Sequence, residues 1–118
     1  MKGIIAVDLF CGAGGLTRGL LDAGIKVVKG FDINPKFKKT YEKNNPGVSF
    51  ISKDVSLLNK QEILDKIDIK DRYFLLAGCA PCQPFSAINK QSLREDSRKS
   101  LLLEFGRLVE ETQPNFIF

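Results

Sequence analysis

The chain has 118 residues, of which 43% are hydrophobic and 27% are charged, a composition typical of one globular domain. Histidine is absent, which excludes every mechanism that needs a histidine base, a Ser-His or Cys-His pair, or a histidine-ligated metal. The formal net charge of +4 permits a nucleic-acid partner without requiring one, and no apolar run is long enough to cross a membrane.

Short apolar runs alternate with amphipathic stretches along the chain. A run without a polar face is typical of a strand in a parallel sheet, whereas apolar residues three and four apart indicate a helix. We predict these elements in chain order: strand 4–10, helix 16–23, strand 26–31, helix 34–44, strand 48–51, helix 59–67, strand 73–77, a polar loop from Gly78 to about Glu95, helix 96–112 and strand 116–118.

Several predicted helices carry signals at their ends. Gly24 suits the position just after a helix C-terminus. Asn34 is a good cap, and Pro35 suits the first helical position behind it. Asn59 and Glu62 have the spacing of a capping box, with Asn in place of the usual Ser or Thr. On the last helix we expect the buried side to carry Leu101, Leu102, Phe105, Leu108 and Val109.

Four strand–helix alternations predict an α/β fold, an open sheet of parallel strands with helices on both faces. No repeat or linker divides residues 1–118, so we treat them as one unit. In such sheets ligands bind at the carboxyl ends of the strands. The polar loop before the last helix carries basic residues, and composition alone favours a solvated surface for it.

A glycine-rich turn follows the first predicted strand. The segment Asp8–Gly15, DLFCGAGG, lies where a nucleotide-like ligand meets a helix N-terminus. Its spacing is G-x-G-G rather than G-x-G-x-x-G, and Asp8 would repel a pyrophosphate but suits the cationic groups of S-adenosylmethionine. Asp32 ends the second strand and could accept hydrogen bonds from ribose hydroxyls, and Asp54 follows the third and could accept from the adenine amino group.

The three cysteines, Cys11, Cys79 and Cys82, do not predict a disulfide framework, and without histidine they make a poor zinc site, so we expect no metal. Cys79 and Cys82 have the C-x-x-C spacing of a redox dithiol. However, this pair follows the fourth strand and enters a polar loop containing Pro84, whereas a redox pair usually opens a helix after the first strand of its unit. We therefore expect Cys79 to be a packing residue, with a redox protein as the alternative.

Two of these segments together resemble the DNA (cytosine-5) methyltransferase family. DLFCGAGG is similar to its first motif, and Pro81–Ser86, PCQPFS, is similar to its fourth. Asp96-Ser97-Arg98 with Leu101, and then Gln113-Pro114, are similar to its fifth motif and the approach to the next strand. The resemblance covers essentially all 118 residues in the right order, and it implies a Rossmann-like methyltransferase sheet that is truncated in its fifth strand.

The resemblance implies S-adenosylmethionine as cofactor, with S-adenosylhomocysteine as product, and no metal. Phe10 would lie against the adenosine, Ile33 would pack on adenine, and Asp32 stands where the family usually has Glu. Cys82 would be the nucleophile that adds to C6 of a flipped-out cytosine. The implied cofactor residues are Asp8, Phe10, Gly12, Gly14, Gly15, Leu16, Asp32, Ile33, Asp54, Val55 and Leu101. The implied catalytic residues are Cys82, Pro81, Gln83 and Ser86, and the candidate nucleic-acid contacts are Ser86, Lys90, Arg94 and Arg98.

The expected activity is methyl transfer to C5 of cytosine in double-stranded DNA, as in a bacterial restriction-modification enzyme of the cytoplasm. The family's later motifs, including the glutamate that protonates cytosine and the target-recognition domain, are not in this sequence. We therefore expect the 118 residues to be inactive alone and to need the remainder of the catalytic domain. Two alternatives stay open: a transfer-RNA methyltransferase of the same family, and a non-catalytic module that binds S-adenosylmethionine.

Overall fold

The computed structural model describes residues 2–81 and 92–118, and over residues 92–100 it describes the backbone only. Strands, α-helices and single 3-10 turns (η) alternate along the chain. In order, the elements are β1 (Gly3–Leu9), α1 (Gly15–Asp22), β2 (Lys26–Asp32), η1 (Pro35–Phe37), α2 (Lys38–Asn44), β3 (Ser49–Ser52), η2 (Val55–Leu57), α3 (Lys60–Leu64), β4 (Arg72–Gly78), α4 (Ser92–Thr112) and β5 (Phe116–Ile117).

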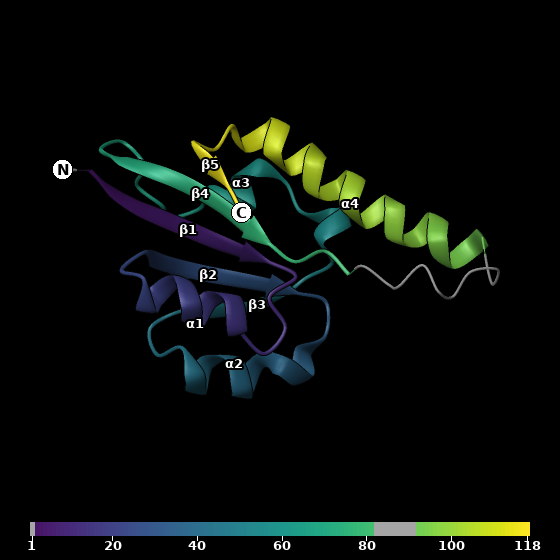
Figure 1. Cartoon of the computed structure of the whole chain (residues 1–118), viewed down its shortest axis with the longest axis horizontal. Coiled ribbons are helices and arrows are strands. Elements are labelled where there is room, and N and C mark those ends of the chain that lie inside the picture. Colours follow the sequence, from purple (N-terminus) through teal and green to yellow (C-terminus); the bar gives the residue numbers. More distant parts are fainter. Residues whose placement is uncertain (1, 82–91) are drawn as a thin grey trace.

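The five strands form one parallel sheet in the order β3-β2-β1-β4-β5 (Figure 1). The chain moves outward from β1 to β3 and then returns to the other side of β1, so the strand order reverses between β1 and β4. The predicted parallel α/β sheet is thereby confirmed. A reversal of this kind opens a crevice at the carboxyl ends of the two strands, where ligands of open α/β sheets bind.

Helices cover both faces of the sheet, α1 and α2 on one face and α3 and α4 on the other (Figure 1). Strand β1 is buried on both faces because Val7 and Leu9 belong to the core under α3 and α4, while Ala6 belongs to the core under α1 and α2. This double burial explains why the first strand reads as a continuous apolar run rather than as an alternation.

Three residues that were predicted to mark helix ends do so in the structure. Gly24 has a positive φ of 88° behind α1, and Asn34 accepts a hydrogen bond from the backbone of Lys36 with Pro35 between them. Asn59 accepts from the N–H of Glu62 at 2.9 Å. The reciprocal half of the capping box is absent, since the carboxylate of Glu62 instead pairs with Lys53 across the fold.

Several boundaries differ from the predicted ones. The helix predicted over 34–44 is a 3-10 turn followed by α2, and the third helix ends at Leu64 and is preceded by an unpredicted turn, η2. The last helix begins at Ser92, four residues before its predicted start. Within it Leu108 is fully buried, but Leu102 is 63% exposed, so the prediction that Leu102 faces inward was wrong.

No helix in the part of the chain that the structure describes has both the length and the apolar character that a membrane span needs.

Candidate functional site

The carboxylates singled out in the sequence come together at one edge of the sheet. Asp8 pairs in register with Gly30 near the end of β2, and Asp32 pairs with Ser52 at the end of β3. Asp54 follows two residues behind β3. Since β1, β2 and β3 are neighbours and all run in the same direction, these three acids sit at the carboxyl ends of adjacent strands, as the sequence predicts.

The glycine-rich turn after β1 is a compact loop fixed by backbone hydrogen bonds. The N–H of Gly14 donates to Cys11 O at 2.9 Å, and the N–H of Cys11 donates to Phe31 O at 3.0 Å. Phe10, Gly12 and Gly14 have positive φ values of 55°, 52° and 94°. A positive φ is unusual for phenylalanine, and such backbone strain is concentrated at functional sites, where the surrounding contacts maintain it.

Tyr41 of α2 packs closely against this turn and against β2. A Cβ atom at Gly14 would lie 2.8 Å from Tyr41 Cδ2 and 2.3 Å from Asn45 Nδ2, and a Cβ atom at Gly30 would lie 2.5 Å from Tyr41 Oη. The ring therefore occupies space that exists only because both positions lack a side chain. Tyr41 and Asn45 are fully buried, and Asn45 Nδ2 donates to Tyr41 O at 2.9 Å.

A chain of hydroxyl groups links Tyr41 to the first acid. Thr17 Oγ1 donates to Asp8 Oδ2 at 2.6 Å, and Tyr41 Oη lies 2.8 Å from Thr17 Oγ1. Because the single hydroxyl proton of Thr17 goes to Asp8, Tyr41 is the donor to Thr17. Asp8 is fully buried, and Oδ1 has no hydrogen-bond partner among the described residues. Burial raises the pKa of Asp8 to about 6, against the opposing effect of Thr17.

Asp8 thus lies beneath the turn, where its charge acts on the loop and any group above it through the intervening backbone.

Asp32 lies at the sheet edge and organises two segments. Its Oδ2 accepts from the N–H of Gly12 at 2.9 Å, and its Oδ1 accepts from the N–H of Asn34 at 2.9 Å. Each carboxylate oxygen has a second lone pair, so both can still accept from a hydroxyl group.

Asp54 shapes the turn behind β3. Its Oδ1 accepts from the N–H of Ser56 at 2.9 Å and from Ser56 Oγ at 2.8 Å. Val55 is buried in the core, whereas Ile33 at the end of β2 is 64% exposed. An exposed isoleucine between carboxylate-bearing turns offers an apolar surface to a flat ring, which fits an adenosine. Leu16 is half-buried at the start of α1, behind the exposed Gly15, and Leu101 is half-buried on α4.

The strand that leads into the cysteine motif, β4, lies beside β1, the strand that leads into the glycine turn. Leu9 at the end of β1 pairs with Gly78 at the end of β4, and a Cβ atom at Gly78 would lie 2.8 Å from Leu9 O and 3.0 Å from Phe105 Cε2. This glycine therefore allows α4 and β1 to approach the strand that leads into the motif. Pro81 is described and exposed. Cys82, Gln83, Ser86 and Lys90 lie outside the described residues.

Two expectations about this region were wrong. The backbone of Arg94 lies on helix α4 rather than in the polar loop, whereas that of Arg98 lies on this helix as predicted, and neither side chain is described. Cys79 was expected to be a packing residue, but it is exposed, because it follows the end of β4 and lies beyond the buried residues of that strand. The packing cysteine is instead Cys11, which is buried, and this burial raises the pKa of its thiol and so disfavours the thiolate.

The supporting residues Thr17, Tyr41 and Asn45 were missed in the sequence. They belong to no local motif, because they lie on α1, on α2 and just after α2, and meet beneath the turn only in the folded chain. Only Gly30 hinted at these residues in the sequence. A glycine in the middle of a strand indicates that another group approaches the backbone closely there.

Comparison with known proteins agrees with this geometry. Residues 4–118 match the family model of the C-5 cytosine-specific DNA methylases. A Type II methylase of Herpetosiphon aurantiacus, M.HgiDII, is 43% identical over 111 residues, which are 94% of this chain and 30% of the relative. The Type II methyltransferase M.Eco47II of Escherichia coli is 36% identical over 94% of this chain and 25% of the relative.

Solved structures give the same result. A prophage-encoded E. coli protein assigned as a DNA modification methyltransferase superposes with a TM-score of 0.78 at 35% identity, over 98% of this chain and 31% of that one. The S. pombe Dnmt2 methyltransferase superposes with a TM-score of 0.65 at 25% identity, over 96% of this chain and 32% of that one. The chain thus spans about a quarter to a third of the length of these four proteins. The family match over nearly every residue places the chain in the C-5 cytosine-specific DNA methylase family.

Proposed function

We propose that this chain is the part of a DNA (cytosine-5) methyltransferase that binds S-adenosylmethionine and carries the nucleophile Cys82. The observation that carries the proposal is the pairing of Leu9 with Gly78 at the reversal point of the sheet. It brings the glycine turn after β1 next to the strand that leads into PCQPFS. The proposed methyl donor on the turn then lies beside the strand from which the motif with the proposed nucleophile continues, at the edge where α/β sheets bind ligands.

The residues present fit the cofactor. Asp32 accepts from ribose hydroxyls while it keeps its bonds to the turn, and Ile33 presents an apolar side chain to the adenine ring. Asp54 accepts from the adenine amino group through Oδ2, which takes no hydrogen bond from the described residues. The buried charge of Asp8 favours the cationic amino and sulfonium groups above the turn, while Phe10, Gly12, Gly14 and Leu16 line the pocket and Leu101 closes it.

Bound S-adenosylmethionine supplies an electrophilic methyl group, but C5 of cytosine is too weak a nucleophile to accept it directly. The Cys82 thiolate adds to C6, which makes C5 an enamine carbon that can accept the methyl group. Loss of the C5 proton then breaks the bond to sulfur and restores the ring. Pro81 and Gln83 shape the loop, Ser86 lies near the nucleic-acid backbone, and Lys90, Arg94 and Arg98 meet phosphates. The base is flipped out of the duplex to reach the thiolate.

The rest of the catalytic domain is needed for activity. Apolar side chains that are exposed at the end of the sheet and on α4 support this proposal, because another part of the domain could cover them. Leu103 is 72% exposed and Phe118 is 70% exposed, and Leu102, Phe116 and Ile117 are also exposed. Large apolar side chains exposed in this number are typical of surface that another part of a protein covers. We propose that the 118 residues alone show no methyl transfer, and that the whole enzyme modifies DNA in a bacterial cytoplasm, as expected for a relative of Type II methylases.

The proposal is tested by a covalent trap on the longest natural chain that carries these residues. The protein is incubated with S-adenosylmethionine and DNA containing 5-fluorocytosine, with 5-fluorocytosine transfer RNA in parallel and Cys82→Ser as control. Fluorine at C5 blocks the final elimination, so a cytosine-5 methyltransferase stays attached. We expect an adduct with DNA that needs Cys82.

An adduct with transfer RNA alone would replace DNA as the substrate. Binding of S-adenosylmethionine without an adduct on either polymer would leave a non-catalytic binding module. Turnover of cytosine DNA by the purified 118-residue chain would refute the proposed need for the rest of the domain.

A further inference from the structure

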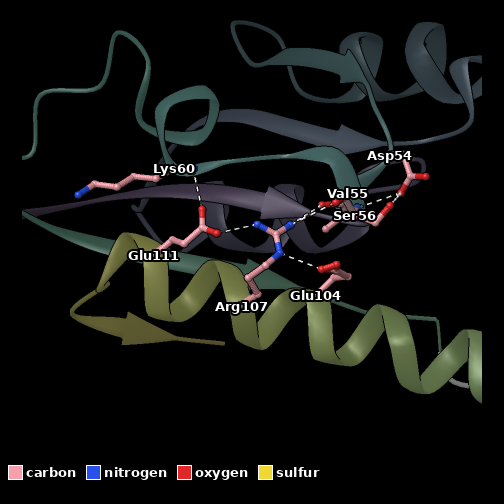
Figure 2. A network of polar contacts seen from close by, with 7 residues as sticks. All are labelled: Asp54, Val55, Ser56, Lys60, Glu104, Arg107 and Glu111. Carbon is pink, nitrogen blue, oxygen red and sulfur yellow. Dashed lines mark hydrogen bonds and ion pairs between the residues drawn. The ribbon is translucent and has the colours of Figure 1, made fainter.

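The side chain of Arg107, on α4, connects this helix to the turn behind β3. Its Nε donates to Glu104 Oε1 and its Nη1 donates to Glu111 Oε2, both at 2.8 Å. Its Nη2 points across to the turn, 3.3 Å from Val55 O and 3.5 Å from Ser56 O (Figure 2). The two glutamates fix the guanidinium plane, and the third nitrogen is thereby aimed at backbone carbonyls of another element.

A surface ion-pair cluster would account for only part of this arrangement. Glu104 and Glu111 lie three residues before and four residues after Arg107, and pairs at this spacing stabilise a helix only slightly when they face solvent. Here the three side chains are 21–36% exposed, and hydrogen bonds to charged groups raise the pKa of Arg107. Helix stabilisation also gives no reason for Nη2 to reach η2.

The contacts converge on the segment that the proposed function assigns to the adenine edge. Asp54 holds Ser56 through two hydrogen bonds, and Arg107 holds the same turn from the other side (Figure 2). Glu111 Oε1 also accepts from the N–H of Lys60, the first residue of α3, at 3.1 Å. Both ends of the η2–α3 connection are therefore tied to α4, and the Asp54 carboxylate is hydrogen-bonded to Ser56 within that connection.

We propose that Arg107 is a positioning residue for recognition of the adenine amino group, acting through the Asp54 turn. This inference rests on the proposed function of Asp54 and adds a selectivity element that contacts no ligand itself. Its consequence is specific. Loss of the Arg107 fork leaves the ribose and methionine contacts intact, because these lie on β1 and β2, but frees the Asp54 carboxylate to shift relative to the adenine edge.

The experiment measures selectivity rather than affinity alone. Binding of S-adenosylhomocysteine and of S-inosylhomocysteine, in which a carbonyl oxygen replaces the amino group, is measured by calorimetry on the longest natural chain that carries these residues. Loss of a hydrogen bond to a charged acceptor predicts at least about a tenfold preference of the wild type for the adenosyl compound. Arg107→Gln should reduce this preference below about threefold.

Arg72→Gln is the matched control, because Arg72 also donates to a backbone carbonyl, that of Asp68 at 3.3 Å, but lies at the opposite end of β4. Its preference should equal that of the wild type. Arg107→Lys keeps the charge without the planar fork and should also lose selectivity, and it serves if the glutamine variant does not fold. An unchanged preference in either folded Arg107 variant would overturn the inference. Failure of the wild type to bind S-adenosylhomocysteine would instead refute the proposed function.

Discussion

Asp8 gives the fold a pH dependence that can be predicted in sign and size. Its pKa is about 6, against 3.8 for an ordinary aspartate, because burial disfavours the charged form. The folded state therefore holds the proton more tightly than the unfolded chain. The stabilising contribution is fully present below about pH 4 and is lost as the pH rises through about 6. At about 1.4 kcal/mol per pKa unit, the loss amounts to roughly 2 to 3 kcal/mol between pH 4 and pH 7.

Asp8→Asn removes this titration and keeps an oxygen that can accept from Thr17. Urea unfolding of both proteins, followed by circular dichroism between pH 4 and pH 7, should show the stability of the wild type falling relative to that of the variant. Carboxylates whose pKa is lowered, such as Glu42 with its hydrogen bond from the N–H of Phe50, act in the opposite direction but equally in both proteins. Parallel pH profiles would show that Asp8 does not titrate in this range and would refute the reasoning.

Three further predictions concern single side chains. Gly30→Ala places a Cβ atom 2.5 Å from Tyr41 Oη and should lower the free energy of unfolding in urea by about 1–3 kcal/mol. Gly19→Ala is the control, because the new atom lies in open space on α1, and it should be neutral or stabilising. Equal effects of the two substitutions would contradict the close packing of Tyr41 against Gly30. Tyr41→Phe removes the donor to Thr17 and should lower the stability by about 1 kcal/mol, and a neutral result would mean that this hydroxyl is not needed. Cys79→Ala should leave the Cys82-dependent adduct on 5-fluorocytosine DNA unchanged in a gel-shift assay. Loss of the adduct would favour the alternative in which Cys79 and Cys82 act together as a redox pair.

The strands could be predicted because apolar residues gather in them and turn signals bound them. Gly24 and Asn34 act through their own backbone neighbourhood, so their roles are readable from local sequence. Glu62 was misread for the opposite reason: its carboxylate pairs with Lys53, nine residues away, and local spacing carries no information about that partner.

The last helix shows a second limit of local reasoning. Three consecutive leucines, Leu101 to Leu103, cannot all face one side of a helix, and the sequence gives no rule for choosing among them. In the fold Leu101 is half-buried, whereas Leu102 and Leu103 are exposed. The choice depends on where the sheet lies relative to α4, which is a property of the whole fold. The outward pair then becomes informative, because it marks surface that we assign to the rest of the domain.

Two of the strand-end acids, Asp32 and Asp54, show why a structural role and a binding role need not compete. From the sequence we expect Asp32 to accept from ribose hydroxyls and Asp54 to accept from the adenine amino group. In the fold each carboxylate fixes backbone N–H groups, Asp32 those of Gly12 and Asn34 and Asp54 that of Ser56. A carboxylate held in this way has little rotational freedom left, and its remaining lone pairs point in fixed directions. Preorganisation of this kind lowers the entropy cost of binding, so the capping bonds support the ligand roles that we propose for these two acids.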